Sequence, residues 1–201
     1  GIVSPSVMNA REIGKVTEFV PDGEEELLDF TPGDGAKYKF KVTGYYQPDV
    51  FAEIDYNYKT HLLMPQICFK EDISDISVCN PRESKTLFVS GAPVTATLVE
   101  EDVAGRGIMV LVITLSNVGG GRVTLPGAEF NSRYDQVAFN IENDAESWEC
   151  RSSGQENTAR FVDGTAVVTC KLRQPLAADE LYTKQIEMTL SYTYRSVIQE
   201  T

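Results

Sequence analysis

One seven-residue pattern occurs twice in this chain of 201 residues, and it restricts the fold more than any other feature. The first copy is Ile54-Asp55-Tyr56-Asn57-Tyr58-Lys59-Thr60, and the second is Leu190-Ser191-Tyr192-Thr193-Tyr194-Arg195-Ser196. Each copy reads aliphatic, polar, Tyr, polar, Tyr, cation, hydroxyl. Successive side chains of a β-strand point to opposite faces, so the aliphatic residue and both tyrosines share one face. The pattern predicts a β-strand at both sites.

We interpret the two copies as the closing strands of two β-modules, although a match of this length also arises by chance. The first module covers residues 1–85, with an extended N-terminal segment and a cysteine-containing connector, and the second covers residues 86–201. Short alternating stretches recur about every 8–12 residues, and none carries a helical stripe. The sequence therefore predicts an all-β fold of two immunoglobulin-like β-sandwich modules, with jelly-roll or Greek-key connections.

Several local patterns support this interpretation. Residues 37–42 alternate Lys with Tyr, Phe and Val, which predicts a strand with one apolar face. Residues 108–116 are continuously apolar and β-branched, which indicates a central strand covered on both faces. Asp163-Gly164 lies between two alternating stretches, as a two-residue type I′ hairpin turn requires. Gly119-Gly120-Gly121 predicts a tight loop, and no Lys-Ser or Lys-Thr follows it as a phosphate-binding loop needs.

The charge balance excludes several classes of partner. The chain has 30 acidic and 18 basic residues, a formal net charge of −12. Such a surface repels the phosphate backbone of nucleic acids and the headgroups of anionic lipids. No apolar run approaches the roughly 20 residues that a membrane-spanning helix needs. The acidic surface is suited to solubility or to cation binding.

The four cysteines, Cys68, Cys79, Cys150 and Cys170, contain no Cys-x-x-Cys pair, which argues against zinc ligation. Two disulfides are the better interpretation, and they indicate an oxidising compartment. Three pairings are possible, and we favour Cys68–Cys79 with Cys150–Cys170 because each closes a short loop. Four reduced, buried thiols are the alternative. The start at Gly1, without a methionine, suits a processed, exported protein or a trimmed one.

No catalytic constellation stands out, so we expect no enzyme and no cofactor. His61 is the only histidine and lacks a recognisable nucleophile beside it. The acidic runs at residues 24–26, 71–75 and 100–102 do not follow the calcium-loop pattern, so no metal site is predicted. Alternation indicates that most of the Tyr-x-Tyr tyrosines face the core or its rim. The less favoured alternative is a sugar-binding platform formed by Tyr45, Tyr46, Tyr56, Tyr58, Trp148, Tyr192 and Tyr194.

The stretch from Ala92-Pro93-Val94 to Val118-Gly119-Gly120-Gly121 runs strand, acidic turn, long apolar strand, Asn-x-Gly. In this it resembles the CARDB-type, immunoglobulin-like β-sandwich modules of archaeal and bacterial surface proteins. The resemblance covers about residues 88–201 and reaches residues 1–85 only through the Tyr-x-Tyr strand. It implies an extracellular structural or adhesive role and carries no catalytic residues.

These observations predict a secreted or cell-surface structural protein, a subunit of a filament, pilus-like fibre, tube or surface layer. Its main partner is then a second copy of itself. We expect residues 1–10 to enter a neighbour's sandwich as a donated strand, with Ile2, Val3, Val7 and Met8 as buried anchors. An ordinary first strand is the alternative for this segment. The alternative function is a secreted module that binds carbohydrate or protein, with a surface glycan as ligand, and a hydrolase comes third.

Overall fold

The computed structural model describes residues 6–14, 17–30, 40–74, 78–131 and 133–200. The chain divides into two compact units, Gly1–Pro48 and Asp49–Thr201. In the part of the first unit that the structure describes, no residue belongs to a helix or strand. A turn does form at Pro21-Asp22, where the backbone N–H of Gly23 donates to the carbonyl of Val20 at 3.1 Å.

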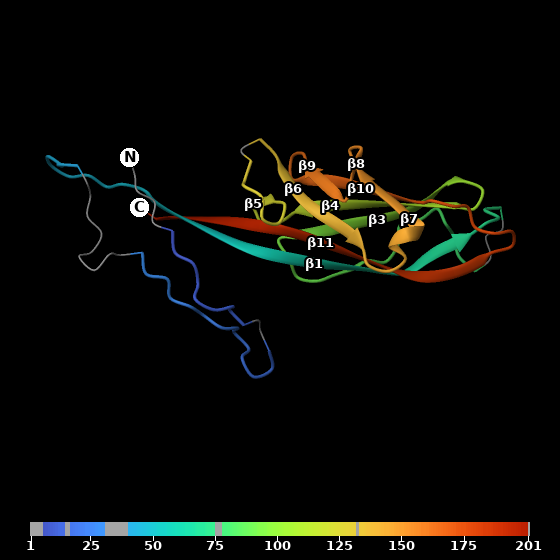
Figure 1. Ribbon diagram of the computed structural model, residues 1–201, viewed down its shortest axis with the longest axis horizontal. Helices are drawn as coiled ribbons and strands as arrows, with labels where there is room; N and C mark the ends of the chain where they lie inside the picture. Colours follow the sequence, from blue (N-terminus) through green and yellow to red (C-terminus); the bar gives the residue numbers. More distant parts are fainter. Residues whose placement is uncertain (1–5, 15–16, 31–39, 75–77, 132, 201) are drawn as a thin grey trace. The chain divides into compact units, whose positions relative to one another are not determined.

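The second unit is all-β, with two antiparallel sheets packed on one core (Figure 1). The first sheet has the order β2-β1-β11-β6-β9, with β5 on β11, and the second has the order β3-β4-β10-β7-β8. The elements are β1 (Val50–Lys70), β2 (Phe88–Val89), β3 (Val94–Gly105), β4 (Ile108–Asn117), β5 (Arg122–Thr124), β6 (Asp135–Ile141), the 3-10 turn η1 (Ala145–Ser147), β7 (Trp148–Ser152), β8 (Gln155–Glu156), β9 (Thr158–Phe161), β10 (Thr165–Leu172) and β11 (Leu181–Glu200).

The two copies of the Tyr-x-Tyr pattern lie side by side. They belong to the antiparallel neighbours β1 and β11, where Tyr56 is opposite Tyr194 and Tyr58 is opposite Tyr192. The predicted boundary near residue 85 therefore differs from the observed division after Pro48. A pattern that repeats in one chain equally suits two strands that pair with each other, because directly opposed residues share a face.

The core lies between the sheets and is built from alternating positions. Along β4, Met109, Leu111, Ile113 and Leu115 are fully buried, while the residues between them are half-buried. The prediction of a central strand here is consistent with the position of β4 between β3 and β10. Full cover of both its faces was an overestimate, because only one face meets the other sheet.

Two strands are longer than their local sequence signals indicate. Proline usually interrupts strand pairing, but β1 continues through Pro65 to Lys70, with a register shift between Met64 and Ile67. A bulge accommodates the missing N–H of proline without ending the pairing. The acidic stretch that follows Val99, expected as a turn over residues 100–107, instead continues β3 along β4 as far as Gly105. Strand β3 has register shifts between Ala96 and Leu98 and between Val103 and Gly105.

The turn at Asp163-Gly164 forms as predicted but connects different sheets. Both residues have positive φ, and Val162 and Thr165 exchange backbone hydrogen bonds of 2.8 and 3.0 Å. However, β9 before the turn belongs to the first sheet and β10 after it to the second. Since β9 and β10 do not pair beyond the Val162–Thr165 bridge, the turn forms a corner of the sandwich.

The glycine loop after β4 packs on Tyr194. The N–H of Gly121 donates to the Tyr194 hydroxyl at 2.7 Å. A Cβ at Gly121 would lie 2.3 Å from the carbonyl oxygen of Arg195, and a Cβ at Gly119 would lie 2.2 Å from the Tyr194 hydroxyl. These glycines are therefore needed for close approach to a tyrosine, which is a structural reason for the Gly-rich sequence.

Both disulfides join the pairs favoured by the short loops, Cys68–Cys79 and Cys150–Cys170. Cys150 on β7 and Cys170 on β10 are directly opposite each other in one sheet. This bond therefore connects neighbouring strands and does not connect the two sheets, unlike the inter-sheet disulfide of antibody domains.

A buried ion pair lies beside the other disulfide. The Glu101 carboxylate accepts hydrogen bonds from Lys85 Nζ at 3.0 Å and from the backbone N–H of Cys68 at 3.0 Å. Burial raises the pKa of Glu101 to about 7, although these hydrogen bonds oppose the shift. Burial works to lower the pKa of Lys85, but hydrogen bonds to Glu83 and Glu101 outweigh it and raise that pKa.

We predict that Gly121→Ala lowers the free energy of unfolding by about 1–3 kcal/mol, because the added methyl group overlaps backbone and ring atoms of β11. Gly91→Ala is the matched control, since a Cβ there meets no atom within 4 Å. Urea denaturation of both variants measures the difference. Equal stability of the two variants would contradict the packing of this loop on Tyr194.

We also predict that Glu101 makes the free energy of unfolding depend on pH. Its folded pKa of about 7 exceeds the ordinary 4.5, so the unfolded chain ionises first as pH rises. The stabilisation that protonated Glu101 adds to the free energy of unfolding is fully present below about pH 4.5. It is lost as pH rises through about 7, a change of up to about 3 kcal/mol. Glu101→Gln should remove this dependence, and Glu100→Gln, at an exposed neighbour, should keep it.

Urea denaturation between pH 4.5 and 8 provides the comparison. The stability of the unsubstituted protein relative to Glu101→Gln should fall as pH rises. A constant difference across this range would show that the Glu101 pKa is unchanged by folding.

Candidate assembly surface

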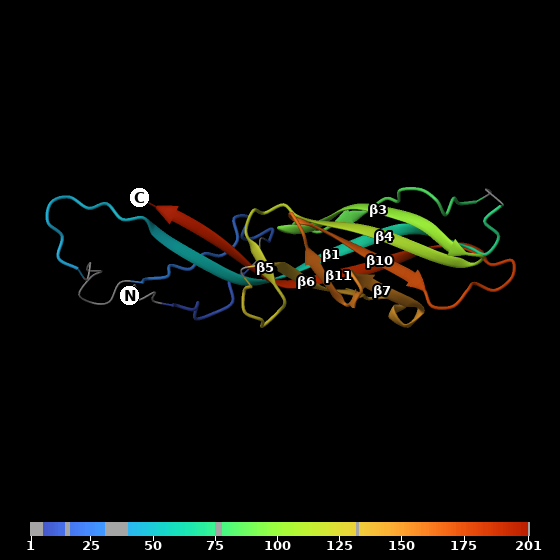
Figure 2. The same ribbon diagram turned by 90° about the horizontal axis from the view of Figure 1, so that it is seen from above.

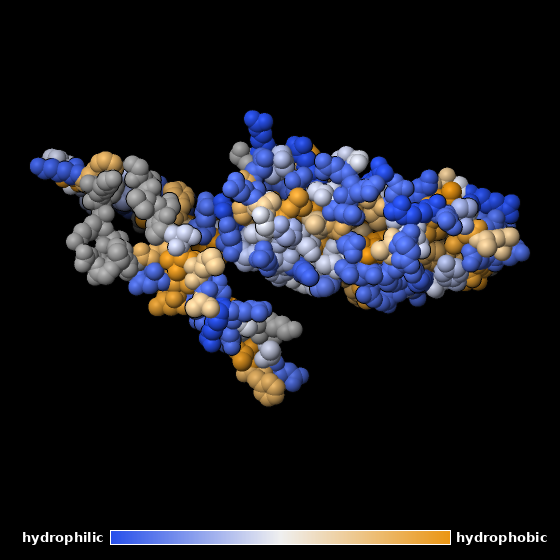
Figure 3. All heavy atoms as spheres, in the orientation of Figure 1, coloured by the Kyte–Doolittle hydropathy of each residue, from blue (hydrophilic) through white to orange (hydrophobic). Residues whose placement is uncertain are grey.

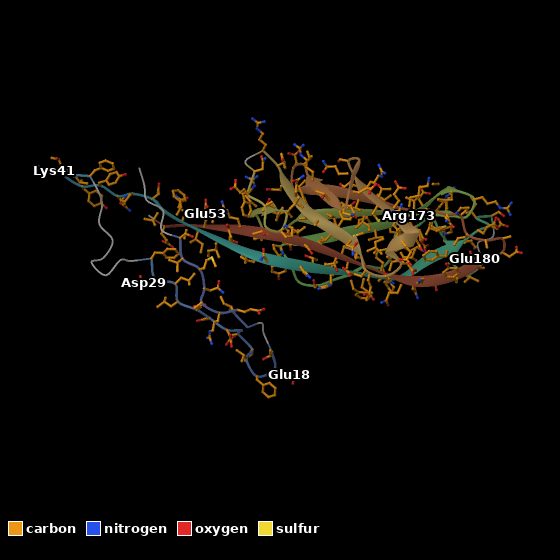
Figure 4. All side chains as sticks on the ribbon, in the orientation of Figure 1. Glu18, Asp29, Lys41, Glu53, Arg173 and Glu180 are labelled. Atoms are coloured by element: carbon orange, nitrogen blue, oxygen red, sulfur yellow. A yellow bond between two sulfur atoms is a disulfide. The ribbon has the colours of Figure 1, made fainter. Side chains whose placement is uncertain are left out.

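The strands β1 and β11 extend beyond the rest of the sandwich (Figures 1 and 2). They pair without a break from Val50–Glu200 to Met64–Ile186. We call residues 50–55 of β1, with residues 195–200 of β11, the projecting ribbon. Glu53 lies on it, whereas Glu180 lies at the opposite end of the unit (Figure 4).

Four tyrosines mark the point where the sandwich core ends, and we call Tyr56, Tyr58, Tyr192 and Tyr194 the tyrosine cluster. The Tyr58 and Tyr192 rings stack at 5.8 Å, and the Tyr56 and Tyr194 rings lie 5.5 Å apart. Their hydroxyls also bond to the loops of the other sheet. Tyr58 donates to the Gly91 carbonyl at 2.9 Å, and the Tyr192 hydroxyl accepts from the Val94 N–H at 3.3 Å.

Beyond this cluster the core-side face of the ribbon is exposed. Alternation and the register place Val50, Ala52, Ile54 and Ile198 on the same face as the tyrosines. Tyr192 is fully buried, Tyr56 is 38% exposed and Ile54 is 45% exposed. The apolar stripe that forms the core thus continues onto a surface that no described strand of the second sheet covers.

The outer face of the ribbon is mixed: it carries the exposed apolar residues Phe51 and Val197 together with a cluster of charged side chains. Arg195 donates two hydrogen bonds to Asp55 at 2.6 and 2.7 Å and pairs with Glu53 at 2.9 Å. The guanidinium also lies 4.1 Å from the centre of the Phe130 ring. These contacts stabilise a two-stranded ribbon, which is marginal in water without support.

Both edges of the ribbon are open in the part of the chain that the structure describes. Strand β2 pairs with β1 only at Leu62 and Leu63, so the other edge of residues 50–55 has no strand neighbour. Strand β5 pairs with β11 at residues 193–195, which leaves residues 196–200 open on that side. Open strand edges present unpaired N–H and C=O groups, which are the groups that an added strand binds.

The predicted anchor residues are not seen in a sheet. Ile2 and Val3 lie outside the described residues. Val7 and Met8 belong to neither a helix nor a strand, and both are exposed, Met8 at 86%. His61 is an exposed residue of β1, and its backbone N–H donates to Ser90 Oγ at 3.0 Å.

The other candidate sites are not assembled. Tyr192, Tyr194 and Trp148 are buried, so they are inaccessible to a sugar ring. Among the described residues no group of three metal-ligating side chains comes together. Two of the acidic runs bond instead to cations: Glu71 pairs with Arg106 and Glu101 with Lys85. The visible face of the sandwich is largely hydrophilic (Figure 3).

Sequence reasoning missed the projecting ribbon. Its exposed apolar residues include Phe51, Ile54, Val197 and Ile198. The available signal was length, because strict alternation runs from Ala52 to Lys59 and apolar residues continue to Met64, far beyond the usual five or six residues of a strand. A strand that long projects from a sandwich built of shorter strands.

No family model, curated protein or solved structure matches this chain. Within the described residues, no helix has the length and apolar character needed to cross a membrane.

We predict that Tyr192→Phe lowers the free energy of unfolding by about 1–3 kcal/mol, because it removes the oxygen that accepts from the buried Val94 N–H. The same oxygen also bonds to Thr60 Oγ1 at 3.0 Å. Tyr56→Phe, at the exposed end of the cluster, should cost less than about 0.5 kcal/mol. Denaturant unfolding with equal m-values provides the comparison. A smaller loss for Tyr192→Phe than for Tyr56→Phe would contradict the role of this hydroxyl.

Proposed function

We propose that this protein is an extracellular structural protein, a subunit of a filament, pilus-like fibre, tube or surface layer, which assembles by strand exchange. The observation that supports this proposal is the projecting ribbon, with an uncovered apolar face and two open edges. Monomeric proteins usually protect such edges with charges, bulges or covering loops. A neighbouring copy that adds a strand here would supply that protection.

The donor in this proposal comes from the N-terminal unit. Residues 1–10 provide Ile2, Val3, Val7 and Met8 as apolar anchors, and Val7 and Met8 are exposed in the single chain. A donor at one end and an acceptor elsewhere make a heterologous contact. Such contacts produce open, head-to-tail polymers unless the rotation closes a ring.

The compartment is part of the proposal. Two disulfides, Cys68–Cys79 and Cys150–Cys170, persist in oxidising surroundings. The net charge of −12 favours solubility and weak interaction with nucleic acids, which suits this compartment without selecting it. The CARDB-type, immunoglobulin-like resemblance of residues 88–201 is consistent with a surface location.

The second candidate function is a secreted binding module. An open edge also accepts an extended peptide from an unrelated protein, by β-augmentation. The exposed Tyr45 offers a ring for a glycan, although the tyrosine cluster itself is closed. This function predicts a stable monomer in the absence of its ligand.

Electron microscopy with light scattering tests the proposal on the intact chain, on a chain without residues 1–10, and on two substituted chains. Ile54→Asp places a charge on the uncovered apolar face of the ribbon, and the control Asn57→Asp places the same charge on the opposite face of β1, beside the ribbon. We expect filaments or tubes from the intact chain and from Asn57→Asp. We expect dispersed particles from the deletion and from Ile54→Asp.

Each result has a distinct meaning. Dispersed particles from the intact chain at all concentrations would overturn the proposal and favour the binding module. Filaments from Ile54→Asp with normal mass per length would show that assembly uses another surface.

A further inference from the structure

The β1 edge of the projecting ribbon requires a strand with two different faces. On the core side, an added strand would lie beside Ala52 and Ile54. On the outer side, it would lie beside Glu53 and Asp55, which share the single guanidinium of Arg195. The outer face also carries the apolar Phe51 and Val197. The edge therefore combines an apolar core-side face with a mixed outer face on which two carboxylates and one guanidinium leave a net negative charge.

One segment of the chain has the matching pattern. Residues 37–42 read Lys-Tyr-Lys-Phe-Lys-Val, with three lysines on one face and three apolar residues on the other. Residues 37–39 lie outside the described residues, and residues 40–46 form no strand. Val42 is 42% exposed in that stretch and Tyr45 is 87% exposed. A strand pattern thus continues into residues 40–42, which belong to no sheet in the described part of the chain.

One orientation of this segment matches both faces of the β1 edge at the same time. If Tyr38, Phe40 and Val42 continue the apolar core-side face, Lys37, Lys39 and Lys41 fall on the outer face beside the two carboxylates. These lysines are three of the chain's 18 basic residues, against 30 acidic ones, so this cationic stripe is unusual in the sequence. The first ten residues lack such a division, because Ile2 and Val3 are adjacent, as are Val7 and Met8.

We propose that residues 37–42 of a second copy add to the β1 edge of the projecting ribbon, with the lysines over Glu53 and Asp55. This inference rests on the proposed function and names the chain segment that occupies one of the two open edges. The edge of residues 196–200 is left for residues 1–10 of the neighbour.

A disulfide experiment on two separate proteins tests the contact. One protein carries Phe40→Cys and the other carries Ile54→Cys, and the two are mixed under mild oxidation. In a register centred on this pair, residues 40 and 54 are opposite each other for both parallel and antiparallel addition. Since each protein has only one added cysteine and no other free one among the described residues, a 40–54 bond has to join two chains.

We expect a band at about 44 kDa, twice the 22.2 kDa of the chain, with the 40–54 linkage located by mass spectrometry. The matched control is Lys41→Cys mixed with Ile54→Cys, because residue 41 belongs to the opposite face. Its yield should be at least tenfold lower. Equal yields from the two mixtures, or no 40–54 bond in the first mixture, would overturn the inference.

A second pair of variants tests the same contact in the assembled polymer. Val42→Lys places a charge on the apolar face of the segment, and Thr43→Lys places the same charge on the lysine face. We expect Val42→Lys to raise the critical concentration for filament formation at least tenfold, and Thr43→Lys to change it less than threefold. Normal assembly by Val42→Lys would overturn the inference while leaving the proposed function intact. Failure of the unsubstituted chain to assemble would overturn both.

Discussion

The pairing of β1 with β11 is the interaction on which the rest of the structure depends. These strands bring residues 50–70 into contact with residues 181–200, so their pairing closes a loop that contains every other strand. Closing such a loop lowers the entropy of the chain before the contacts that offset this loss have formed. The stacked tyrosines and the long unbroken register supply many contacts to the same pair of strands, which offsets that loss.

The tyrosine cluster also determines where the interior stops. On one side of it, Leu190 and Leu62 are buried under the second sheet, and on the other side Ile54 and Ile198 are exposed on the same face. The hydroxyls of Tyr58 and Tyr192 bond to Gly91 and Val94, at the start of β3, where the second sheet begins. A uniform alternation in sequence thus produces two environments because the second sheet is shorter than the first.

Parts of this fold follow from the sequence because they depend on local chemistry. The Asp163-Gly164 turn requires two residues that tolerate positive φ, and the Cys68–Cys79 loop is short. The sequence did not predict that Tyr56 and Tyr194 lie opposite each other on paired strands. Alternation indicates which residues of one strand share a face, and it does not indicate which strands are neighbours. The exposure of Ile54 was missed for a similar reason, since the extent of the opposing sheet is not encoded in β1 itself.

The pairing of Val50 with Glu200 at the outer end of the ribbon has a mechanical consequence. Because the second unit begins and ends beside this residue pair, tension applied between its two chain ends would separate β1 from β11 one residue pair at a time. Tension carried by a strand added alongside β1 would act along the strands, perpendicular to the inter-strand hydrogen bonds, and would load many of them together. A fibre linked through the ribbon edges would therefore resist pulling far better than a simple chain of units joined end to end.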